Sequence, residues 1–395
     1  MNTVNLRRYS EADALREFSP RMLVALMDEH RQFLADKGIE LPPVGEEAEL
    51  DYHSLATIFL SPDDIPRDLV ERFYMVKQMS KPEAMDRIVD AVRDRQLQFR
   101  FPANSTPEDV AAHLLLTDPK LFQEIYAEKA VARYRAFVYY VARHKNGAFR
   151  PPASLAPLEK ALNGWYEAHQ RGRSAQVFGR QHRQEFWYYV RHAQPMKRDG
   201  CVDLKDLHSS SMIYRPERHD VVVYDAEAGE LRVHADCEQE PELFRVLFGL
   251  HLFGAYDYFP ASKRKYTLDP LKRGRAVLAS AGIDGLREIT LREVEFQGHG
   301  ELGMRERMVA PDLFSIFEAR QCGIPAEADI RMARFQVRFG DAAKPRTFTI
   351  RPSNFATFSR DDDSVPLHEW LRRQGFVLPR HAESRPDEPW HLEYS

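Results

Sequence analysis

The sequence predicts an α+β fold, with an all-helical N-terminal domain followed by a mixed α+β C-terminal domain. In the first half, apolar residues recur three and four positions apart, whereas several stretches beyond residue 219 alternate as strands do. The 395 residues suffice for two domains with separate cores. We expect a helical domain at 1–195, a linker at 196–218, an α+β domain at 219–380 and a flexible tail at 381–395.

Helix starts in the N-terminal part carry recognisable capping signals. Residues 80–83 (SKPE) and 105–108 (STPE) are capping boxes with a proline near the first turn. The pair Asp118-Pro119 opens what we expect to be the longest helix, which would run to the Asn-Gly pair at 146–147. Further helices are expected over 155–169 and 173–192.

The chain after residue 195 changes character. Residues 196–218 are rich in polar and turn residues and lack a sustained period, so they predict a linker. Two apolar runs flank a turn with Gly229 near its end, which predicts a β-hairpin over 221–234. The other elements expected in this part are helices at 241–256, 269–281, 311–317 and 367–374, a strand at 289–296, and a second hairpin at 330–350.

The stretch from Arg133 to Arg198 breaks the charge balance of the chain. The whole protein has 56 basic and 60 acidic side chains, whereas this window has 13 lysines and arginines, three acids and 12 aromatic residues. Basic residues interleaved with aromatic ones are typical of phosphate contact combined with base stacking. On a helix over 173–192, one side would pack into the core and the other would be basic. The core side would carry Phe178, His182, Phe186 and Tyr189, and the basic side Arg180, Arg183, Trp187 and Arg191.

We therefore expect a non-enzymatic subunit of a cytoplasmic multi-protein system, which binds DNA or RNA or assembles with other protein subunits through this basic aromatic face. The expected nucleic-acid-binding residues are Arg180, Arg183, Trp187, Arg191, Arg173, Arg143 and Lys145. Two other interpretations stay open. The face could be a solvated surface whose arginines only keep the protein in solution, or it could meet an acidic protein partner.

Several function classes lack their sequence signals. No P-loop, G-x-S-x-G, H-x-x-x-H or H-E-x-x-H pattern occurs, so we expect no catalytic residue, cofactor or metal ligand. Cys201, Cys237 and Cys322 are too far apart for a zinc pattern or a disulfide framework, which favours a reducing, cytoplasmic compartment. Nowhere do 18 apolar residues run together, so no membrane span is expected.

An Mg²⁺-dependent nuclease is the alternative function, because its acids need only lie at strand ends beside a scissile phosphate. Two sets of acids have a suitable arrangement, although such acids are more often solvated turn residues. The first set is Asp199 with Asp203-Leu204-Lys205. The second is Asp220, Asp225 and Asp236, with Glu238.

Overall fold

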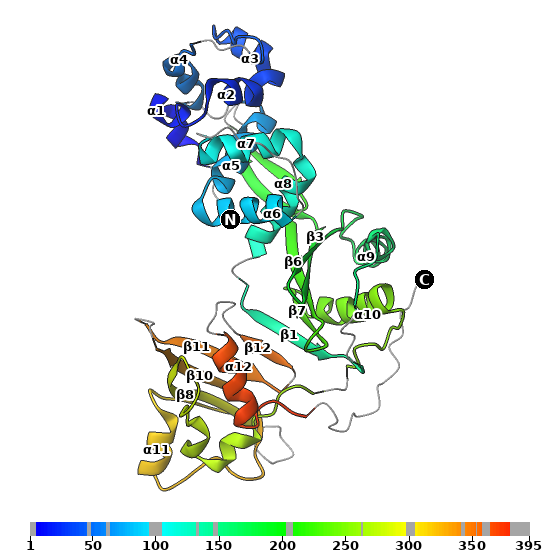
Figure 1. The fold of residues 1–395 in the computed structure, drawn as a ribbon, viewed down its shortest axis with the longest axis vertical. Coiled ribbons are helices and arrows are strands. Elements are labelled where there is room, and N and C mark those ends of the chain that lie inside the picture. The colour runs from blue at the N-terminus through cyan, green and yellow to red at the C-terminus, as the bar shows by residue number, and fades with distance from the viewer. Residues whose placement is uncertain are drawn as a thin grey trace. The chain divides into compact units, whose positions relative to one another are not determined.

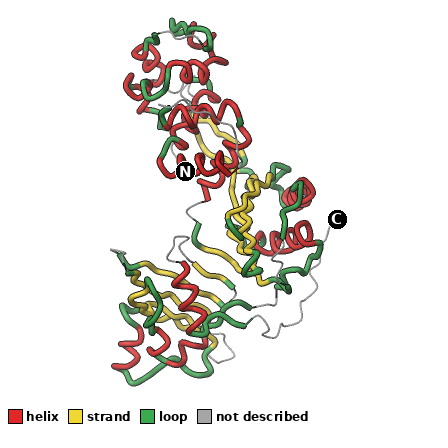
Figure 2. Tube along the Cα trace, viewed as in Figure 1, coloured by secondary structure: helices red, strands yellow, loops and turns green. Residues whose placement is uncertain are grey.

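The α+β fold class is confirmed by the computed structural model, in which helices dominate the N-terminal part and antiparallel strands the remainder (Figure 2). The predicted tail at 381–395 and the predicted site residue Lys145 lie outside the described residues. The structure describes residues 5–45, 49–60, 64–94, 105–131, 134–144, 149–202, 208–261, 264–297, 305–340, 344–352, 354–357 and 364–379.

The chain divides into two compact units, which we describe separately. The first comprises residues 1–132 and 197–214, and the second comprises residues 133–196 and 215–395. This division falls earlier in the chain than the boundary expected near residue 195. None of the described helices is long and apolar enough to cross a bilayer.

The first unit is built mainly from short helices around one apolar core (Figure 1). Its aromatic centre joins Tyr9, Phe59 and Phe73, with ring centroids 4.9 to 5.6 Å apart. The helix start predicted at 105–108 is present, but Thr106 is the N-cap in place of Ser105: its hydroxyl accepts a hydrogen bond from the Asp109 amide. The α-helices are α1 (Ala12–Leu15), α2 (Pro20–Met27), α3 (Arg31–Asp36), α4 (Tyr52–Thr57), α5 (Arg67–Met79), α6 (Pro82–Asp94), α7 (Pro107–Thr117) and α8 (Pro119–Val131). Short 3₁₀ turns occur at Arg7–Ser10, Asp28–His30 and Ile58–Leu60.

The predicted linker is wrong in its described residues, because they form strands. β4 (Lys197–Val202) pairs antiparallel with β5 (Ser209–Tyr214), in register from Lys197 opposite Tyr214 to Val202 opposite Ser209. Most side chains of this hairpin are exposed on both faces. Its polar surface gives no apolar alternation, and alternation was the signal from which strands were predicted.

The second unit is organised by a ten-stranded antiparallel sheet with the order β2-β3-β6-β7-β1-β12-β11-β10-β8-β9. The strands of its first half are β1 (Ala136–Val141), β2 (Gln176–His182), β3 (Glu185–Ala193), β6 (Glu217–Asp225) and β7 (Glu230–His234). The remaining strands are β8 (Leu286–Gln297), β9 (Arg305–Val309), β10 (Asp329–Phe339), β11 (Arg346–Arg351) and β12 (Phe355–Thr357). The predicted hairpins are confirmed as β6–β7 and β10–β11.

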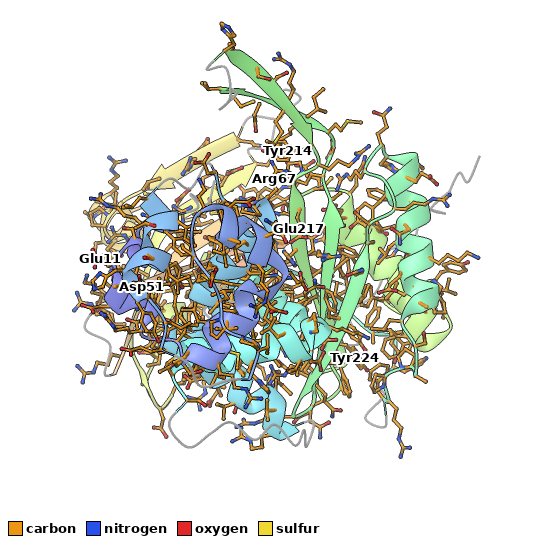
Figure 3. The ribbon with its side chains drawn as sticks, turned by 90° about the horizontal axis from the view of Figure 1, so that it is seen from above. Glu11, Asp51, Arg67, Tyr214, Glu217 and Tyr224 are labelled. Carbon is orange, nitrogen blue, oxygen red and sulfur yellow. The ribbon has the colours of Figure 1, made fainter. Side chains whose placement is uncertain are left out.

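Helices α9 (Ala156–Ala168) and α10 (Glu240–Phe253) cover one face of β3 and β6, as the views of Figures 1 and 3 agree. An aromatic and aliphatic core fills this layer. Elsewhere in the unit, Trp370 of α12 (Ser364–Arg373) is fully buried and packs against Phe335 and Phe348. The remaining α-helix described in this unit is α11 (Leu313–Ala319).

The helix predicted over 173–192 is wrong, because this segment forms the β2–β3 hairpin with Arg183 and Gln184 in the turn. Its run of aromatic and β-branched residues has high strand propensity. Alternate residues of β3 then reach the core, which is period two and not period 3.6. The apparent helical stripe arose because both faces of this strand carry aromatic residues.

The long helix predicted over 118–147 is also wrong. α8 ends at Val131, and the sequence AFVYYV that follows forms β1, again from strand-favouring residues. The helix predicted over 269–281 is replaced by two 3₁₀ turns, Asp269–Arg273 and Arg275–Leu278. Gly274 separates them at φ 80°, a conformation that no α-helix continues through.

Candidate metal centre

The predicted basic face does not exist as one helical surface. Arg180 and Trp187 lie directly opposite each other on β2 and β3, so they share one side of the sheet, and Arg183 lies in the turn at φ 54°. Arg232 covers one side of the Trp187 ring at 5.7 Å, and the Trp187 indole donates to Glu185 at 3.0 Å. Only part of the expected set is therefore brought together.

Three of the other expected residues pair with acids of the chain itself. Arg143 forms an ion pair with Asp257 at 2.6 Å. Arg173 pairs with Glu167 near the end of α9. Arg191 lies 3.7 Å from Glu217 across β3 and β6. These pairs partly neutralise the basic excess that was counted along the sequence.

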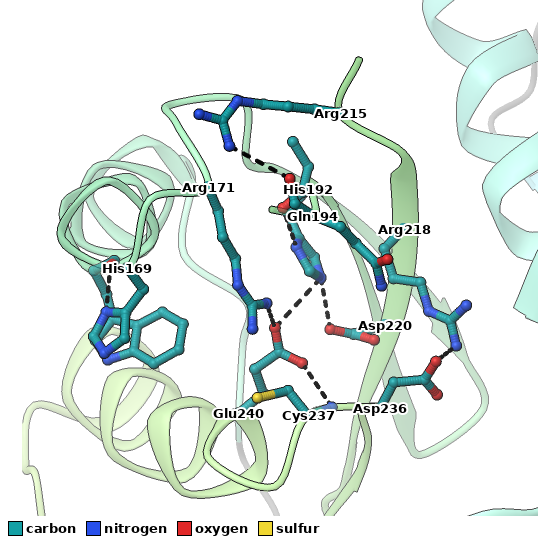
Figure 4. Close-up of polar contacts among 12 residues, drawn as sticks. His169, Arg171, His192, Gln194, Arg215, Arg218, Asp220, Asp236, Cys237 and Glu240 are labelled. Carbon is teal, nitrogen blue, oxygen red and sulfur yellow. Dashed lines mark hydrogen bonds and ion pairs between the residues drawn. The ribbon is translucent and has the colours of Figure 1, made fainter. Parts of the chain in front are cut away.

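A different group of polar residues converges between the sheet and α10 (Figure 4). His192 lies near the end of β3, Asp220 lies near the start of β6, and Glu240 is the first residue of α10. We call these three residues the His–Asp–Glu cluster. Their side chains meet because His192 is paired with Arg218 in the β3–β6 ladder, and Asp220 is the diagonal neighbour on the same face.

The cluster is buried and closely spaced. His192 is 2 % exposed, and Asp220 and Glu240 are each 1 % exposed. The His192 Nε2 atom lies 2.8 Å from Asp220 Oδ2 and 3.7 Å from Glu240 Oε1. One donor atom from each residue falls within 4.8 Å of the others, a spacing at which the three could hold one metal ion.

The hydrogen bonds of His192 determine what its Nε2 atom can do. The Nδ1 atom lies 3.1 Å from the carbonyl oxygen of Ala193, which can only accept, so Nδ1 carries a hydrogen. In a neutral ring, Nε2 then presents a lone pair to the Asp220 carboxylate, and two acceptors at 2.8 Å repel. A proton or a metal cation is needed between them. A backbone carbonyl on the far ring nitrogen is also a common arrangement for a metal-binding histidine.

Among the described residues, Asp220 lacks one hydrogen-bond partner, and the charge of Glu240 is disfavoured. Asp220 Oδ1 is buried without a hydrogen-bond partner among these residues, and so is the nearby Tyr166 hydroxyl. Burial raises the pKa of Glu240, and the negative charge of Asp220 raises it further. A cation bound between the two carboxylates would offset both effects.

Arg171 and Tyr166 complete the surroundings of the cluster. The Tyr166 ring stacks on His192 with centroids 4.4 Å apart and an interplanar angle of 9°. Arg171 follows α9 and forms an ion pair with Glu240 Oε1, while its guanidinium lies 5.7 Å from the Tyr166 ring centroid. The Cys237 amide donates to Glu240 Oε2 at 3.2 Å. Glu240 is thus held from two sides.

Asp220 is the only member of the cluster that the sequence singled out. Asp220 was among the acids considered for the nuclease alternative, but the structure pairs it with His192 and Glu240. Of its expected companions, Asp236 forms an ion pair with Arg218. His192 and Glu240 were missed because they lie 28 and 20 residues from Asp220, so no short motif joins them.

A glycine-rich segment between β8 and β9 has the spacing of a nucleotide-binding motif. Residues 298–303 read GHGELG and fit the G-x-G-x-x-G spacing of dinucleotide-binding loops. These residues lie outside the described part of the chain, but β8 before them and β9 after them pair antiparallel. A dinucleotide-binding loop leads from a strand into a helix, so the context of that motif is missing.

No protein-family model matches the sequence, and no curated protein matches it.

Proposed function

We propose that the protein is a metal-stabilised binding subunit, in which His192, Asp220 and Glu240 hold one divalent cation. The observation that carries this proposal is the approach of three ligand atoms to within 4.8 Å of one another in residues that are almost fully buried. The unpartnered Asp220 Oδ1 supports it, since a cation would satisfy that atom.

The ligand set favours a transition-metal ion. Mg²⁺ and Ca²⁺ prefer ligand sets made of oxygen atoms, whereas an imidazole nitrogen suits Zn²⁺, Mn²⁺ or Fe²⁺. One nitrogen and two carboxylate groups therefore point to Zn²⁺ or Mn²⁺. This preference departs from the Mg²⁺ of the nuclease alternative.

Burial favours a structural role for the cation over a catalytic one. A nuclease must bring a scissile phosphate to its metal, yet none of the three ligands is more than 2 % exposed. A buried cation would instead fix the start of α10 to β3 and β6. In this role the metal contributes directly to folding free energy.

Metal titration of protein that has been stripped with a chelator tests the proposal. We expect one Zn²⁺ or Mn²⁺ per chain by calorimetry, with Mg²⁺ much weaker. His192→Ala and Asp220→Asn should weaken binding about 100-fold, in line with the effect of losing ligands or their close partners. His251→Ala, on the same helix α10 as Glu240, is the matched control and should bind as the unaltered protein does.

Two results would contradict this function. If the stripped protein binds no metal, or binds it equally well in the His192 and Asp220 variants, the cluster is a buried ion-pair network only. If the loaded protein cleaves DNA or RNA and Asp220→Asn abolishes the cleavage, the cation is catalytic and the nuclease alternative holds.

A second proposal is that the protein contacts nucleic acid, and one structural observation supports it. Arg180 and Trp187 are cross-strand neighbours, and Arg183 lies in the adjoining turn, so a phosphate contact and a stacking contact could be made side by side. We propose that any contact with DNA or RNA uses these three residues of the β2–β3 hairpin. Assembly with other protein subunits is a proposal of the same standing.

A further inference from the structure

Arg171 brings a positive charge into contact with the His–Asp–Glu cluster, in addition to the cation proposed there. Its guanidinium pairs with Glu240 Oε1, and this same oxygen lies 3.7 Å from His192 Nε2. One carboxylate oxygen therefore serves both Arg171 and the proposed metal position. The Arg171 side chain is 12 % exposed and the Glu240 side chain 2 %, so water screens their attraction weakly.

The backbone around Arg171 is fixed by a hydrogen bond, but the guanidinium has a second possible contact, with the neighbouring aromatic rings. The Arg171 amide donates to the Tyr166 carbonyl at 2.8 Å, which closes the end of α9. Gln170 and Gly172, on either side, have φ values of 59° and 77°. The guanidinium also lies 5.7 Å from the rings of both Trp165 and Tyr166. Loss of the Glu240 contact would leave this aromatic contact available.

We propose that Arg171 is a built-in substitute for the metal: the Arg171–Glu240 ion pair and metal binding are alternatives, so the site loads and empties reversibly. This inference rests on the proposed function and names its regulation. Without metal, the guanidinium neutralises Glu240 and the buried carboxylate is not left unpaired. With metal, a divalent charge and a guanidinium on the same oxygen repel, and Arg171 shifts toward Trp165.

The alternative role of Arg171 is support from outside the ligand set. An arginine that donates to a ligating carboxylate can orient it and strengthen metal binding. The two roles predict opposite signs for the same substitution. Competition predicts tighter metal binding when the positive charge is removed, whereas support predicts weaker binding.

The experiment compares the full-length chain with Arg171→Met, which keeps most of the side-chain length without charge, and Arg171→Lys, which keeps the charge. Zn²⁺ and Mn²⁺ are titrated by calorimetry. We expect Arg171→Met to bind at least about tenfold more tightly and Arg171→Lys to bind within about threefold of the unaltered chain, since electrostatic repulsion is the term that changes. Intrinsic tryptophan fluorescence should change on metal addition in the unaltered chain and less in Arg171→Met.

The outcomes separate this inference from the proposed function. If the unaltered chain binds metal and Arg171→Met binds equally or more weakly, competition is overturned and the metal site stands. If only Arg171→Met binds metal, Arg171 blocks the site in the unaltered chain, and both reversible loading and the proposed metal-stabilised function are overturned. If neither binds, both are overturned. Melting temperatures in chelator check that Arg171→Met is folded, and a variant unfolded without metal but folded with it supports the competition.

Discussion

His192 and Asp220 are 28 residues apart in sequence, yet the imidazole Nε2 atom and the carboxylate Oδ2 atom lie 2.8 Å apart inside the protein. The contact links β3 to β6 through side chains in addition to their backbone ladder. A charge-assisted hydrogen bond in a buried setting is strong, but each partner becomes costly once the other is removed. This asymmetry determines how the site responds to substitution.

Removal of the Asp220 carboxylate should destabilise the protein severely. We expect Asp220→Ala to lower the free energy of unfolding by about 3–5 kcal/mol, because it leaves buried charge without its partner. Asp220→Asn retains the shape and a hydrogen bond and should cost less. Urea denaturation in chelator measures both. Glu227→Ala, an exposed acid after the same strand, should stay within about 0.5 kcal/mol. A loss below about 1 kcal/mol for Asp220→Ala would mean that the cluster contributes little to stability.

Two helical glycines should respond to alanine in opposite directions. At Gly249 of α10 an added Cβ would lie 2.8 Å from the Ala255 carbonyl oxygen, whereas at Gly164 of α9 nothing lies within 4 Å. We expect Gly249→Ala to cost about 1–3 kcal/mol through overpacking against backbone. Gly164→Ala should stabilise by about 0.5–1 kcal/mol through lower chain entropy. Thermal melts of the two variants check the pair, and stabilisation at Gly249 would contradict the close approach.

If the protein binds nucleic acid, the salt dependence should locate the contact on the β2–β3 hairpin. We expect Arg180→Gln with Arg183→Gln to flatten the slope of log K against log salt by about 1.4–1.8, since each phosphate contact contributes about 0.7–0.9. Arg143→Gln with Arg173→Gln is the control, because both arginines lie outside the β2–β3 hairpin. Binding of single-stranded probes followed by anisotropy measures the slopes. Equal slopes in both double variants would leave these arginines as a solvated surface.

Acid should destabilise the protein partly through His368 on α12. Burial, together with the cations Lys265 and Arg232, lowers the His368 pKa from 6.5 to about 3. Between pH 6.5 and pH 3, His368 is therefore protonated in the unfolded chain and neutral in the folded chain. The stability that the neutral, buried His368 allows is present above about pH 6.5 and is lost as pH falls toward 3. Urea midpoints at pH 7, 6 and 5 should fall less steeply in His368→Gln than in the unaltered chain. Parallel lines for the two proteins would show that His368 titrates normally.

The sequence predicts elements well where one face is buried and the period is clear. The β6–β7 hairpin was predictable because its apolar runs flank a turn that ends in Gly229, and α9 and α10 show helical spacing. The β2–β3 hairpin was missed because residues 186–190 are aromatic or β-branched without interruption. Such a run shows no period of two, and chance spacing of four then resembled a helix.

The His–Asp–Glu cluster could not be predicted from spacing for a geometric reason. Its members come from two strands and a helix start, and their approach depends on the register of β3 against β6. A shift of one residue in that register would turn Asp220 to the opposite face of the sheet from His192. The inference of one basic face from the stretch at 133–198 failed for a similar reason. A charge count along the chain cannot show that Arg143, Arg173 and Arg191 each lie beside an acid.

β1 lies between β7 and β12 in the sheet, although both of its neighbours come much later in the chain. During synthesis, the apolar strand at 136–141 emerges long before residues 230–234, and its other partner at 355–357 follows near the end. Until then β1 has unpaired backbone edges and the composition of an aggregation-prone segment. In a polypeptide that terminates before Phe355, the edge of β1 that pairs with β12 stays permanently unpaired. A stop codon between residues 241 and 354 should therefore yield insoluble protein, even though the His–Asp–Glu cluster would be fully encoded.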